Sequence, residues 1–308
     1  MRSRRTDAEP VVTLADITEI ELVLLKRLRE VTMGDHRSRS QGSGFDFVGL
    51  RDWQTGDKFS SIDWAQSSFT NFSPLVVREF EQPSTANVVA VADLSLSTRC
   101  GVDGVPIAAV VARALATIGL SAVFFQDPFG VVTFDEGFQH LGRIRPRTGK
   151  SHVVHCLDAY QHLAGLQPVK RNGDISTTLG GYLRNTSMVP VISDFLFDDC
   201  DAVLRELALL NAMHDVFLIM VDSSFAFEVP HVSAGWIDVV DVETGHTCTL
   251  SRASLSHLAV RIREWQGEVQ RAAKELDLDV VQIGFDSTQA DLALGEFVAE
   301  RRLRKTDK

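Results

Sequence analysis

Short apolar runs alternate with stretches of helical periodicity along most of the chain, and this pattern constrains the fold most. The runs lie at 88–92, 188–195, 215–222 and 278–285, and apolar residues at helical spacing fill much of the sequence between them. Strands that are apolar on both faces are typical of parallel sheets covered by helices on both sides. The sequence therefore predicts an α/β fold with a doubly wound, mainly parallel, Rossmann-like sheet.

The order of the runs also predicts how the strands are arranged. Residues 130–144 cross the turn sequence Asp135-Glu136-Gly137, which favours a hairpin. We expect its first strand, 130–134, beside strand 88–92, and its second strand, 138–142, at an edge of the sheet. The strands expected to be parallel and central are 88–92, 189–193, 216–221 and 279–284. The first two of these are expected to be neighbours.

The first 85 residues differ in character from the rest of the chain. Residues 13–31 repeat apolar side chains at helical spacing, and 34–44 form a polar linker rich in glycine and serine. Residues 45–85 are rich in aromatic and turn residues, and short strands are expected around 46–50 and 75–80. The predicted parts are an N-terminal helix, linker and aromatic strand-containing segment over 1–85, and an α/β domain over 86–308.

The composition excludes several classes of protein. Hydrophobic residues make up 44% of the chain and charged residues 23%, which is typical of globular proteins. The net charge of −10 argues against nonspecific nucleic-acid binding, which needs a basic surface. The most apolar stretch, 106–120, contains Arg113 and is shorter than the ~18 residues of a membrane span. With four dispersed cysteines and no signal-peptide pattern, we expect a cytoplasmic protein with reduced thiols.

An acid and two hydroxyls follow the first apolar run, in the sequence "VVAVADLSLSTRCG". Asp93 ends the strand, and Ser95 and Ser97 come at every second position after it. A second apolar run, "VPVISDF", ends in the same way at Asp194. Ligands of open α/β sheets bind outside the carboxyl ends of the strands, where the strand order reverses. The two acids therefore predict a site at this edge of the sheet.

The side chains that the sequence offers to this site all present oxygen. Carboxylates, hydroxyls and water suit Mg²⁺, Mn²⁺ or Ca²⁺ better than zinc. The segment "DISTTLGGYL" adds a further hydroxyl, from Thr177 or Thr178, just before a predicted helix. A competing interpretation makes Asp93 and the serines a helix cap or an Asx-turn without any metal.

The same pattern resembles a known metal site. D-x-S-x-S, a later threonine and an aspartate after a further strand resemble the metal-ion-dependent adhesion site of von Willebrand factor A domains. The upstream sequence resembles the signature of the bacterial family called domain of unknown function fifty-eight, over residues 45 to about 300. The residues that match this signature are Leu50, Arg51, Trp53, Gly56, Asp57, Ile62, Asp63, Trp64, Arg78, Glu79, Phe80 and Glu81.

The chain departs from the family pattern at several positions. Thr55 replaces a common proline, and Phe59-Ser60-Ser61 stand where the family usually has an arginine. The segment "SSFTN" replaces a basic one, and Thr178 follows Thr177 where the family usually has Asp or Asn. These changes leave the metal triad intact and alter a surface of the upstream segment.

The resemblance implies a von Willebrand A-like fold and a non-catalytic, metal-dependent adaptor that binds proteins. Mg²⁺, with Mn²⁺ or Ca²⁺ as substitutes, would leave one position open for an Asp or Glu of the partner. The family suggests a MoxR-type AAA+ ATPase as that partner, in a chaperone-like or assembly role. The metal ligands carried over by position are Asp93, Ser95, Ser97, Thr177 and Asp194.

The alternative function is a Mg²⁺-dependent hydrolase that acts on phosphate esters. An aspartate nucleophile of the haloacid dehalogenase type needs a second acid two residues later. Here Leu94 and Ser95 follow Asp93, and the sequence shows no clear general base. The adaptor is therefore the favoured interpretation.

Two other motifs suggest ligands. His152, His155 and Cys156 can share one face of a helix, so zinc is conceivable, although a partly exposed helix explains them equally well. The segment "GRIRPRTGKS" (142–151) resembles a phosphate loop, but six residues separate its glycines where the Walker motif has four. We interpret its basic residues as a solvated run, or at most as a patch for an acidic partner.

Overall fold

The computed structural model divides the chain into two compact units. The larger unit comprises residues 1–31 and 85–302, and the smaller one comprises 32–84 and 303–308. The residues that the structure describes are 11–35, 46–55, 57, 59, 62–81, 86–102, 105–135, 138, 140–183, 185–227, 235–240, 246–285 and 287–306. The helix at the N-terminus, grouped above with the aromatic segment, belongs up to Val31 to the unit that contains the sheet.

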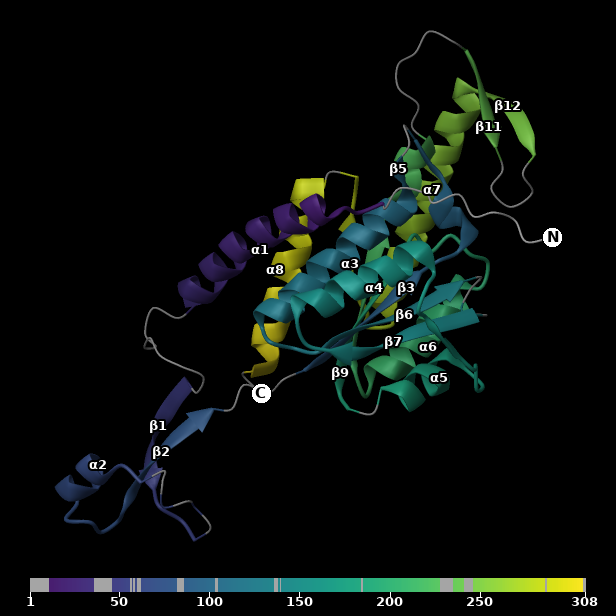
Figure 1. Ribbon diagram of the computed structural model, residues 1–308. Helices are drawn as coiled ribbons and strands as arrows, with labels where there is room; N and C mark the ends of the chain where they lie inside the picture. The colour runs from purple at the N-terminus through teal and green to yellow at the C-terminus, as the bar shows by residue number, and fades with distance from the viewer. Residues whose placement is uncertain are drawn as a thin grey trace. The chain divides into compact units, whose positions relative to one another are not determined.

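A seven-stranded sheet forms the centre of the larger unit (Figure 1). Its strands in spatial order are β13 (Asp279–Ile283), β10 (Asp215–Val221), β9 (Ser187–Ser193), β3 (Asn87–Asp93), β6 (Phe129–Asp135), β7 (His140–Arg147) and β8 (Gln167–Val169). The first five are parallel, and β7 and β8 run antiparallel to their neighbours. The predicted α/β class, the mainly parallel sheet and the adjacency of β3 and β9 are confirmed.

Two positions in the sheet differ from the prediction. β13 lies at an edge, and its residues are largely exposed or half-buried, although its apolar run suggested a central strand. β7 is not an edge strand, because β8 pairs with its outer side. β8 has only three residues, which is too short to show strand periodicity in the sequence.

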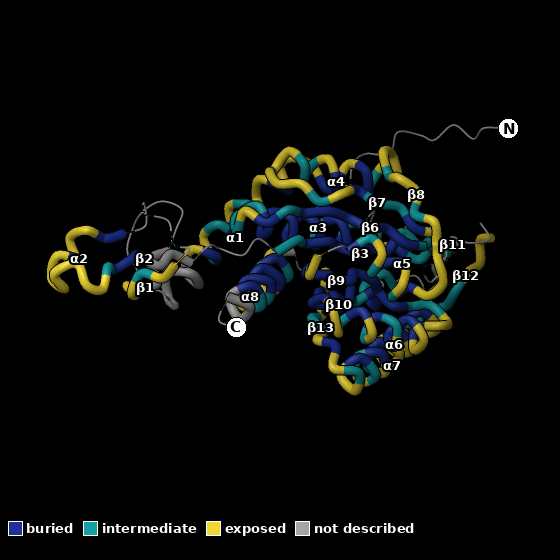
Figure 2. Tube along the Cα trace, turned by 90° about the horizontal axis from the view of Figure 1, so that it is seen from below, coloured by how far each residue is buried: buried dark blue, intermediate teal, exposed yellow. Residues whose placement is uncertain are grey.

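Helices cover both faces of the sheet (Figures 1 and 2). On one face, α3 (Ile107–Phe124), α4 (Lys150–His162), α8 (Ser287–Thr306) and the first part of α1 (Leu14–Asp35) share one apolar core. On the other face, α5 (Ile175–Tyr182), α6 (Cys200–Asn211) and α7 (Arg252–Glu275) share a second core. Alternate residues of β3 enter the two cores, as expected for a strand buried on both sides. The sheet is therefore doubly wound.

Helix α3 fills the core between the sheet and the other helices of its face. In the described part of the chain it is the one helix long and apolar enough to cross a membrane, but 72% of it is buried inside the protein. At Gly119 a Cβ atom would lie 2.6 Å from Val153 of α4, so the glycine allows the two helices to approach closely. These contacts account for the apolar composition of α3 by packing alone.

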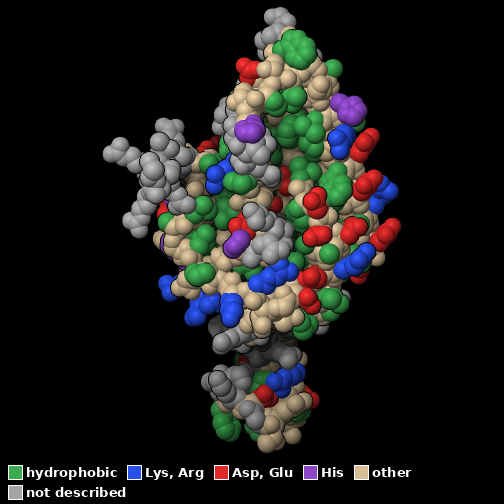
Figure 3. Space-filling model, turned by 90° about the vertical axis from the view of Figure 1, so that its right-hand side faces the viewer, with side chains coloured by type: hydrophobic (Ala, Val, Ile, Leu, Met, Phe, Trp, Pro, Cys, Tyr) green, Lys and Arg blue, Asp and Glu red, His purple; other side chains and the backbone are tan. Residues whose placement is uncertain are grey.

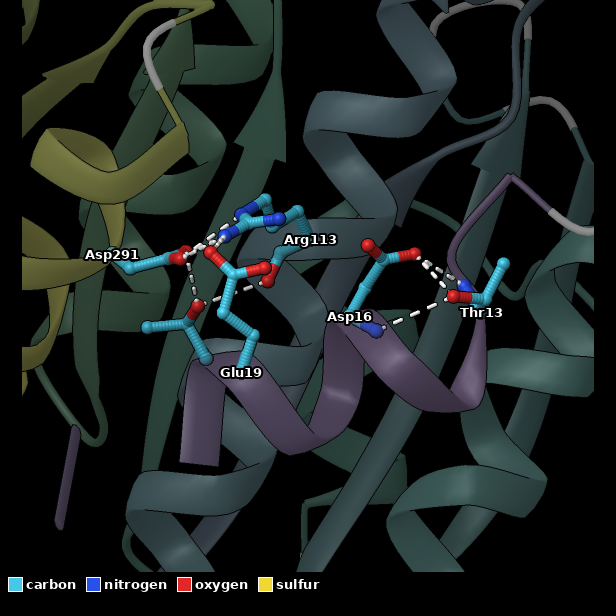
Figure 4. A network of polar contacts seen from close by, with 6 residues as sticks. Thr13, Asp16, Glu19, Arg113 and Asp291 are labelled. Atoms are coloured by element: carbon cyan, nitrogen blue, oxygen red, sulfur yellow. Dashed lines mark hydrogen bonds and ion pairs between the residues drawn. The ribbon is translucent and has the colours of Figure 1, made fainter. Parts of the chain in front are cut away.

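A polar network joins α1, α3 and α8 (Figure 4). Arg113 on α3 donates from Nε to the Asp291 carboxylate of α8 at 2.9 Å, and Glu19 of α1 lies 3.8 Å from the same guanidinium. Thr117 donates from Oγ1 to the other oxygen of Asp291, also at 2.9 Å. Asp291 is only 2% exposed, so its hydrogen bonds replace those that it would make to water.

Replacing Thr117 by valine is expected to lower the free energy of unfolding by about 1.5–3 kcal/mol, because the buried Asp291 carboxylate loses a donor. Valine keeps the shape and a similar helix propensity, so the hydroxyl is the main change. Urea unfolding followed by circular dichroism measures the effect. Thr18→Val is the matched control, because the Thr18 hydroxyl bonds a backbone oxygen at the exposed surface of α1. Equal losses in the two variants would contradict this role for the Asp291 network.

The smaller unit contains the family signature. β1 (Asp46–Asp52) and β2 (Val76–Glu81) pair antiparallel, as expected for strands around 46–50 and 75–80. Asp63 caps α2 (Trp64–Phe69) by accepting hydrogen bonds from two backbone amides of its first turn. Arg51 and Asp57 form a bidentate ion pair, with distances of 2.7 and 2.9 Å. This ion pair between two signature residues stabilises the turn that follows β1.

The remaining elements lie around the carboxyl edge of the sheet and beyond it. They are the 3₁₀ turns η2 (Leu96–Arg99) and η3 (Ser223–Phe227) and the short pairs β4 (Gly101–Val102) with β5 (Val105–Pro106) and β11 (Trp236–Val240) with β12 (Thr247–Ser251). On the face shown in Figure 3, Asp and Glu side chains gather toward the right, with some Lys and Arg among them. This mixture agrees with a solvated, moderately acidic surface.

Candidate metal centre

The two predicted acids lie where the strand order of the sheet reverses. From β3 the chain continues to β6 on one side, and it later returns to β9 on the other side. Ala92 pairs with Ile192, so the ends of the two strands are level and Asp93 lies across from Ser193. Asp194 follows directly. This is the position at which open α/β sheets bind their ligands.

Asp93 is fully buried and receives two hydrogen bonds. Its Oδ1 accepts from the backbone N–H of Ser95 at 2.7 Å, and its Oδ2 accepts from the hydroxyl of Ser193 at 2.5 Å. The hydroxyls of Ser95 and Ser97 lie 2.9 Å apart, so the D-x-S-x-S segment folds its polar side chains together. The bond from the Ser95 N–H is the Asx-turn of the competing interpretation, and it uses the backbone of Ser95 and not the two serine hydroxyls.

Asp194 is 1% exposed and is less well satisfied. Its Oδ1 accepts from the Leu196 N–H at 3.2 Å, whereas its Oδ2 has no hydrogen-bond partner among the described residues. A buried carboxylate oxygen without a donor costs free energy. A bound cation at this oxygen would supply the missing interaction.

Helix α7 holds the backbone around Asp194. Gln266 donates from Nε2 to the Asp194 carbonyl at 3.0 Å, and Trp265 donates from Nε1 to the Phe195 carbonyl at 2.9 Å. Phe195 has a φ of 56°, which is uncommon for a residue other than glycine. The Ser193 hydroxyl accepts from the Phe195 N–H at 2.9 Å. The turn after β9 is therefore fixed from both sides.

Burial raises the pKa of both carboxyls. Burial raises the pKa of Asp194 to about 7, and the neighbouring Asp93 adds to the rise. Burial also raises the pKa of Asp93, although the hydroxyls of Ser193 and Ser95 oppose the shift. Tyr160 of α4 donates to the Asp93 carbonyl at 2.8 Å, and burial together with both acids raises the pKa of its phenol. Burial thus disfavours the ionised form of both carboxyls, and a bound cation would favour it.

The structure brings four of the five predicted ligands together. Asp93, Ser95 and Ser97 form one hydrogen-bonded group, and Asp194 lies on the neighbouring strand end. Thr177 is exposed on the first turn of α5, and within the described ranges no hydrogen bond joins it to the other four. The Thr178 hydroxyl is buried and accepts from the Asn172 N–H at 3.0 Å, so it stabilises the start of α5.

Three residues of the site were not predicted from the sequence. Ser193 precedes Asp194 and could have been found, because its hydroxyl stands at the same strand end. Tyr160 and Gln266 reach the site from α4 and α7, and nothing local in their helices indicates this. All three contact Asp93 or the backbone of Asp194.

The donor set fits a hard cation. Two carboxylates and two hydroxyls are the oxygen ligands that Mg²⁺ accepts together with water. Across the residues that the structure describes, no group of three His, Cys, Asp or Glu is placed to hold a metal. On α4, the Cys156 sulfur lies 3.6 Å from His152, but burial raises the pKa of this thiol to about 12. A protonated thiol is a poor zinc ligand, so this pair does not make a second centre.

The model of the family described as "Protein of unknown function DUF58" matches residues 49–272. The chain belongs to the DUF58 family. This match confirms the resemblance to this family that the upstream signature residues suggested. DUF58 relatives include the uncharacterized protein Rv1480 of Mycobacterium tuberculosis and Mb1516 of Mycobacterium bovis. Each is 26% identical over 247 residues, covering 78% of this chain and 74% of the relative.

Two of the solved structures with some likeness to this DUF58 chain come from Bacteroides species. An aerotolerance-related membrane protein from Bacteroides fragilis aligns at 13% identity with a TM-score of 0.40, covering 70% of this chain and 99% of that one. The conserved hypothetical protein BatB from Bacteroides thetaiotaomicron aligns at 11% identity with a TM-score of 0.39, covering 72% and 98%.

Proposed function

We propose that this DUF58 protein is a non-catalytic adaptor that binds a protein partner through a metal ion, with Mg²⁺ as the preferred ion. The observation that carries the proposal is the buried Oδ2 of Asp194, which finds no donor among the residues that the structure describes and lies beside the second acid, Asp93. A divalent cation would neutralise both carboxylates and occupy the unsatisfied oxygen.

The ligands of the proposed ion would come from both strand ends. Asp93 and Asp194 supply the charge, and Ser95 and Ser97 supply neutral oxygens. Thr177, at the start of α5, would complete the set through its hydroxyl. Since α5 follows β8 and also begins at the carboxyl edge of the sheet, Thr177 would approach the ion by a movement of this first turn.

The proposal includes a von Willebrand A-like fold for the larger unit. Two features support it: the D-x-S-x-S segment follows the strand at which the order reverses, and the sheet is parallel apart from β7 and β8. When bound, the ion would act as a Lewis acid that accepts a carboxylate of the partner. The residues of this chain would hold the ion and exclude competing anions by burial.

The partner that we propose is a MoxR-type AAA+ ATPase or a protein that it remodels, which presents an Asp or Glu, in the cytoplasm. This choice rests on the family resemblance of the upstream sequence, and the matched family is itself described as of unknown function. The protein's net charge of −10 repels an acidic partner. The affinity for that partner would therefore depend on the metal contact.

A binding assay with the purified MoxR-type ATPase of the same organism tests the proposal. We expect binding in Mg²⁺, loss of binding in EDTA, and loss with Asp194→Asn in either buffer. Asp222→Asn is the matched control, because Asp222 follows β10 at the same edge but accepts from the Ser224 N–H as a local cap. Equal binding in Mg²⁺ and EDTA would contradict the proposal. Mg²⁺-dependent cleavage of a phosphate ester that Asp194→Asn abolishes would instead favour the hydrolase.

A further inference from the structure

The arginine-rich strand β7 borders a pocket at the opposite, amino edge of the sheet. The cavity has a volume of about 400 Å³. Its polar lining comprises Asn87, Arg143, Arg145, Tyr182, Asn185 and Ser187. Asn87 and Ser187 are the first residues of β3 and β9, so the pocket lies a full strand length from Asp93 and Asp194. It is independent of the candidate metal centre.

Strand alternation directs the arginines toward this pocket. Leu141 belongs to the core under α5 and α6, whereas Ile144 belongs to the core on the other face. Because side chains alternate along a strand, Arg143 lies on the same face as Leu141. Its guanidinium stands 5.0 Å from the centre of the Tyr182 ring, at the end of α5. Both Arg143 and Arg145 lower the pKa of Tyr182 against the larger effect of burial, which places both cations near its hydroxyl.

Neither arginine is neutralised. Within the part of the chain that the structure describes, no carboxylate forms an ion pair with Arg143 or Arg145, although acids outnumber bases by ten in the whole sequence. The Arg143 Nε is buried and has no hydrogen-bond acceptor in the described ranges. Arginine does not lose its proton in proteins, so the unsatisfied donor keeps its full charge. Such a group is costly to bury unless an anion is bound to it.

We propose that this pocket binds the phosphate group of a small phosphorylated metabolite. Guanidinium groups match phosphate oxygens through paired hydrogen bonds, and two of them at one cavity suit a dianion. The side chains of Asn87 and Asn185 border the same space and offer amide donors for a further oxygen. A volume of about 400 Å³ lies in the range of small-molecule sites and exceeds what a bare phosphate fills.

The proposal gives a role to the segment "GRIRPRTGKS", whose glycine spacing excludes a Walker-type loop. In that loop the backbone N–H groups surround the phosphate. Here residues 142–147 lie in the strand β7, and Arg143, Arg145 and Pro146 of this strand line the cavity. The proposed phosphate site therefore depends on arginine side chains, whereas the Walker loop that the motif resembles depends on backbone N–H groups.

Thermal melts of the full-length protein in inorganic phosphate test the proposal, at constant ionic strength set with chloride. We expect the wild-type Tm to rise saturably with phosphate. Arg143→Gln and Arg145→Gln should each weaken the apparent affinity about tenfold or more, since each removes charged hydrogen bonds. Arg147→Gln is the matched control, because Arg147 lies on the same strand and is exposed like Arg145, but it does not line the pocket.

The melts without phosphate separate binding from a structural role. If Arg143 serves phosphate, Arg143→Gln should keep or raise the Tm of the ligand-free protein, because it removes a half-buried cation whose buried Nε has no acceptor among the described residues. A wild-type Tm that ignores phosphate, or an equal loss of response in Arg147→Gln, would overturn the proposal. An acetate series that reproduces the full shift would overturn the assignment to phosphate.

Discussion

Replacing Asp127 by alanine is expected to lower the free energy of unfolding by about 3–5 kcal/mol, because it leaves a buried arginine without its counter-ion. Asp127 lies between α3 and β6 and is 2% exposed. Its carboxylate accepts from Nε of Arg302 at 2.8 Å and from a terminal nitrogen of the same side chain at 3.2 Å. It also accepts from the Ala86 N–H at 3.0 Å, just before β3. One side chain thus joins α8 to the start of the central strand.

The size of this effect comes from desolvation and not from a strong net attraction. Burial raises the pKa of Asp127 even though Arg302 opposes the shift, so the cost of removing the carboxylate from water exceeds the gain from its partner. Such a pair adds little to stability compared with two apolar residues, but removal of one member exposes the full desolvation cost of the other.

Urea unfolding of the protein measures this loss in the free energy of unfolding of the larger unit. Asp279→Ala is the matched control, because Asp279 pairs with the neighbouring Arg301 but is 62% exposed. It should cost about 0–1 kcal/mol, as exposed ion pairs do. The double variant Asp127→Leu with Arg302→Met should recover most of the loss. If the double variant is less stable than Asp127→Ala, the explanation by an unpaired charge is wrong.

The central strands could be predicted because their signal is local. β3, β9 and β10 are buried on both faces, so every residue of each run is constrained to be apolar or small. The same constraint makes the polar residues at their carboxyl ends visible. Asp93 and Asp194 were predicted to converge for this reason, and the adjacency of β3 and β9 confirms that the two strand ends meet.

The features that were missed depend on contacts between distant parts of the chain. β8 is defined by its pairing with β7 and not by its own three residues. Gln266 lies on the buried side of α7 and donates hydrogen bonds to the Asp194 and Val221 carbonyls. Nothing in the sequence of α7 distinguishes it from the polar residues on the exposed side of the helix. The interpretation of the basic segment as a solvated run holds for Arg145 and Arg147, which are exposed. Arg143 is half-buried against Tyr182, and only the fold shows that α5 ends opposite it.

Asp194→Asn is expected to abolish the stabilisation of the protein by Mg²⁺ while leaving the metal-free protein as stable as the wild type or slightly more so. The variant removes one of two like charges that are buried side by side, which favours the metal-free fold. It also removes an anionic ligand from a cation that gives up water reluctantly. At a Mg²⁺ concentration one hundred times Kd, the wild type should gain about 2.7 kcal/mol that the variant lacks.

Variants of Asp93 and Ser95, at the end of β3, test whether Asp93 is a metal ligand or only a turn-forming residue. Asp93→Ala should also lose the response to Mg²⁺, and Ser95→Ala should lose only part of it, because water can replace a neutral ligand. If Asp93 is only a turn-forming residue, its loss should cost about 1 kcal/mol in EDTA and change nothing in the response to Mg²⁺. A wild type whose melt ignores saturating Mg²⁺, with Asp93→Ala melting lower in EDTA, would decide for the cap.

The pH dependence of the same melts gives a second, independent measurement. The pKa of Asp194 is raised from 3.8 to about 7 in the folded protein, so its favourable contribution is present below pH 3.8 and is lost as the pH rises through about 7. In EDTA the wild type should therefore lose up to about 1.4 kcal/mol per pH unit in this window relative to Asp194→Asn. In Mg²⁺ the ion displaces the proton, so its stabilising effect should grow across the same window. Asp222→Asn should follow the wild type in both buffers, and parallel curves for wild type and Asp194→Asn in EDTA would show that Asp194 is not the shifted group.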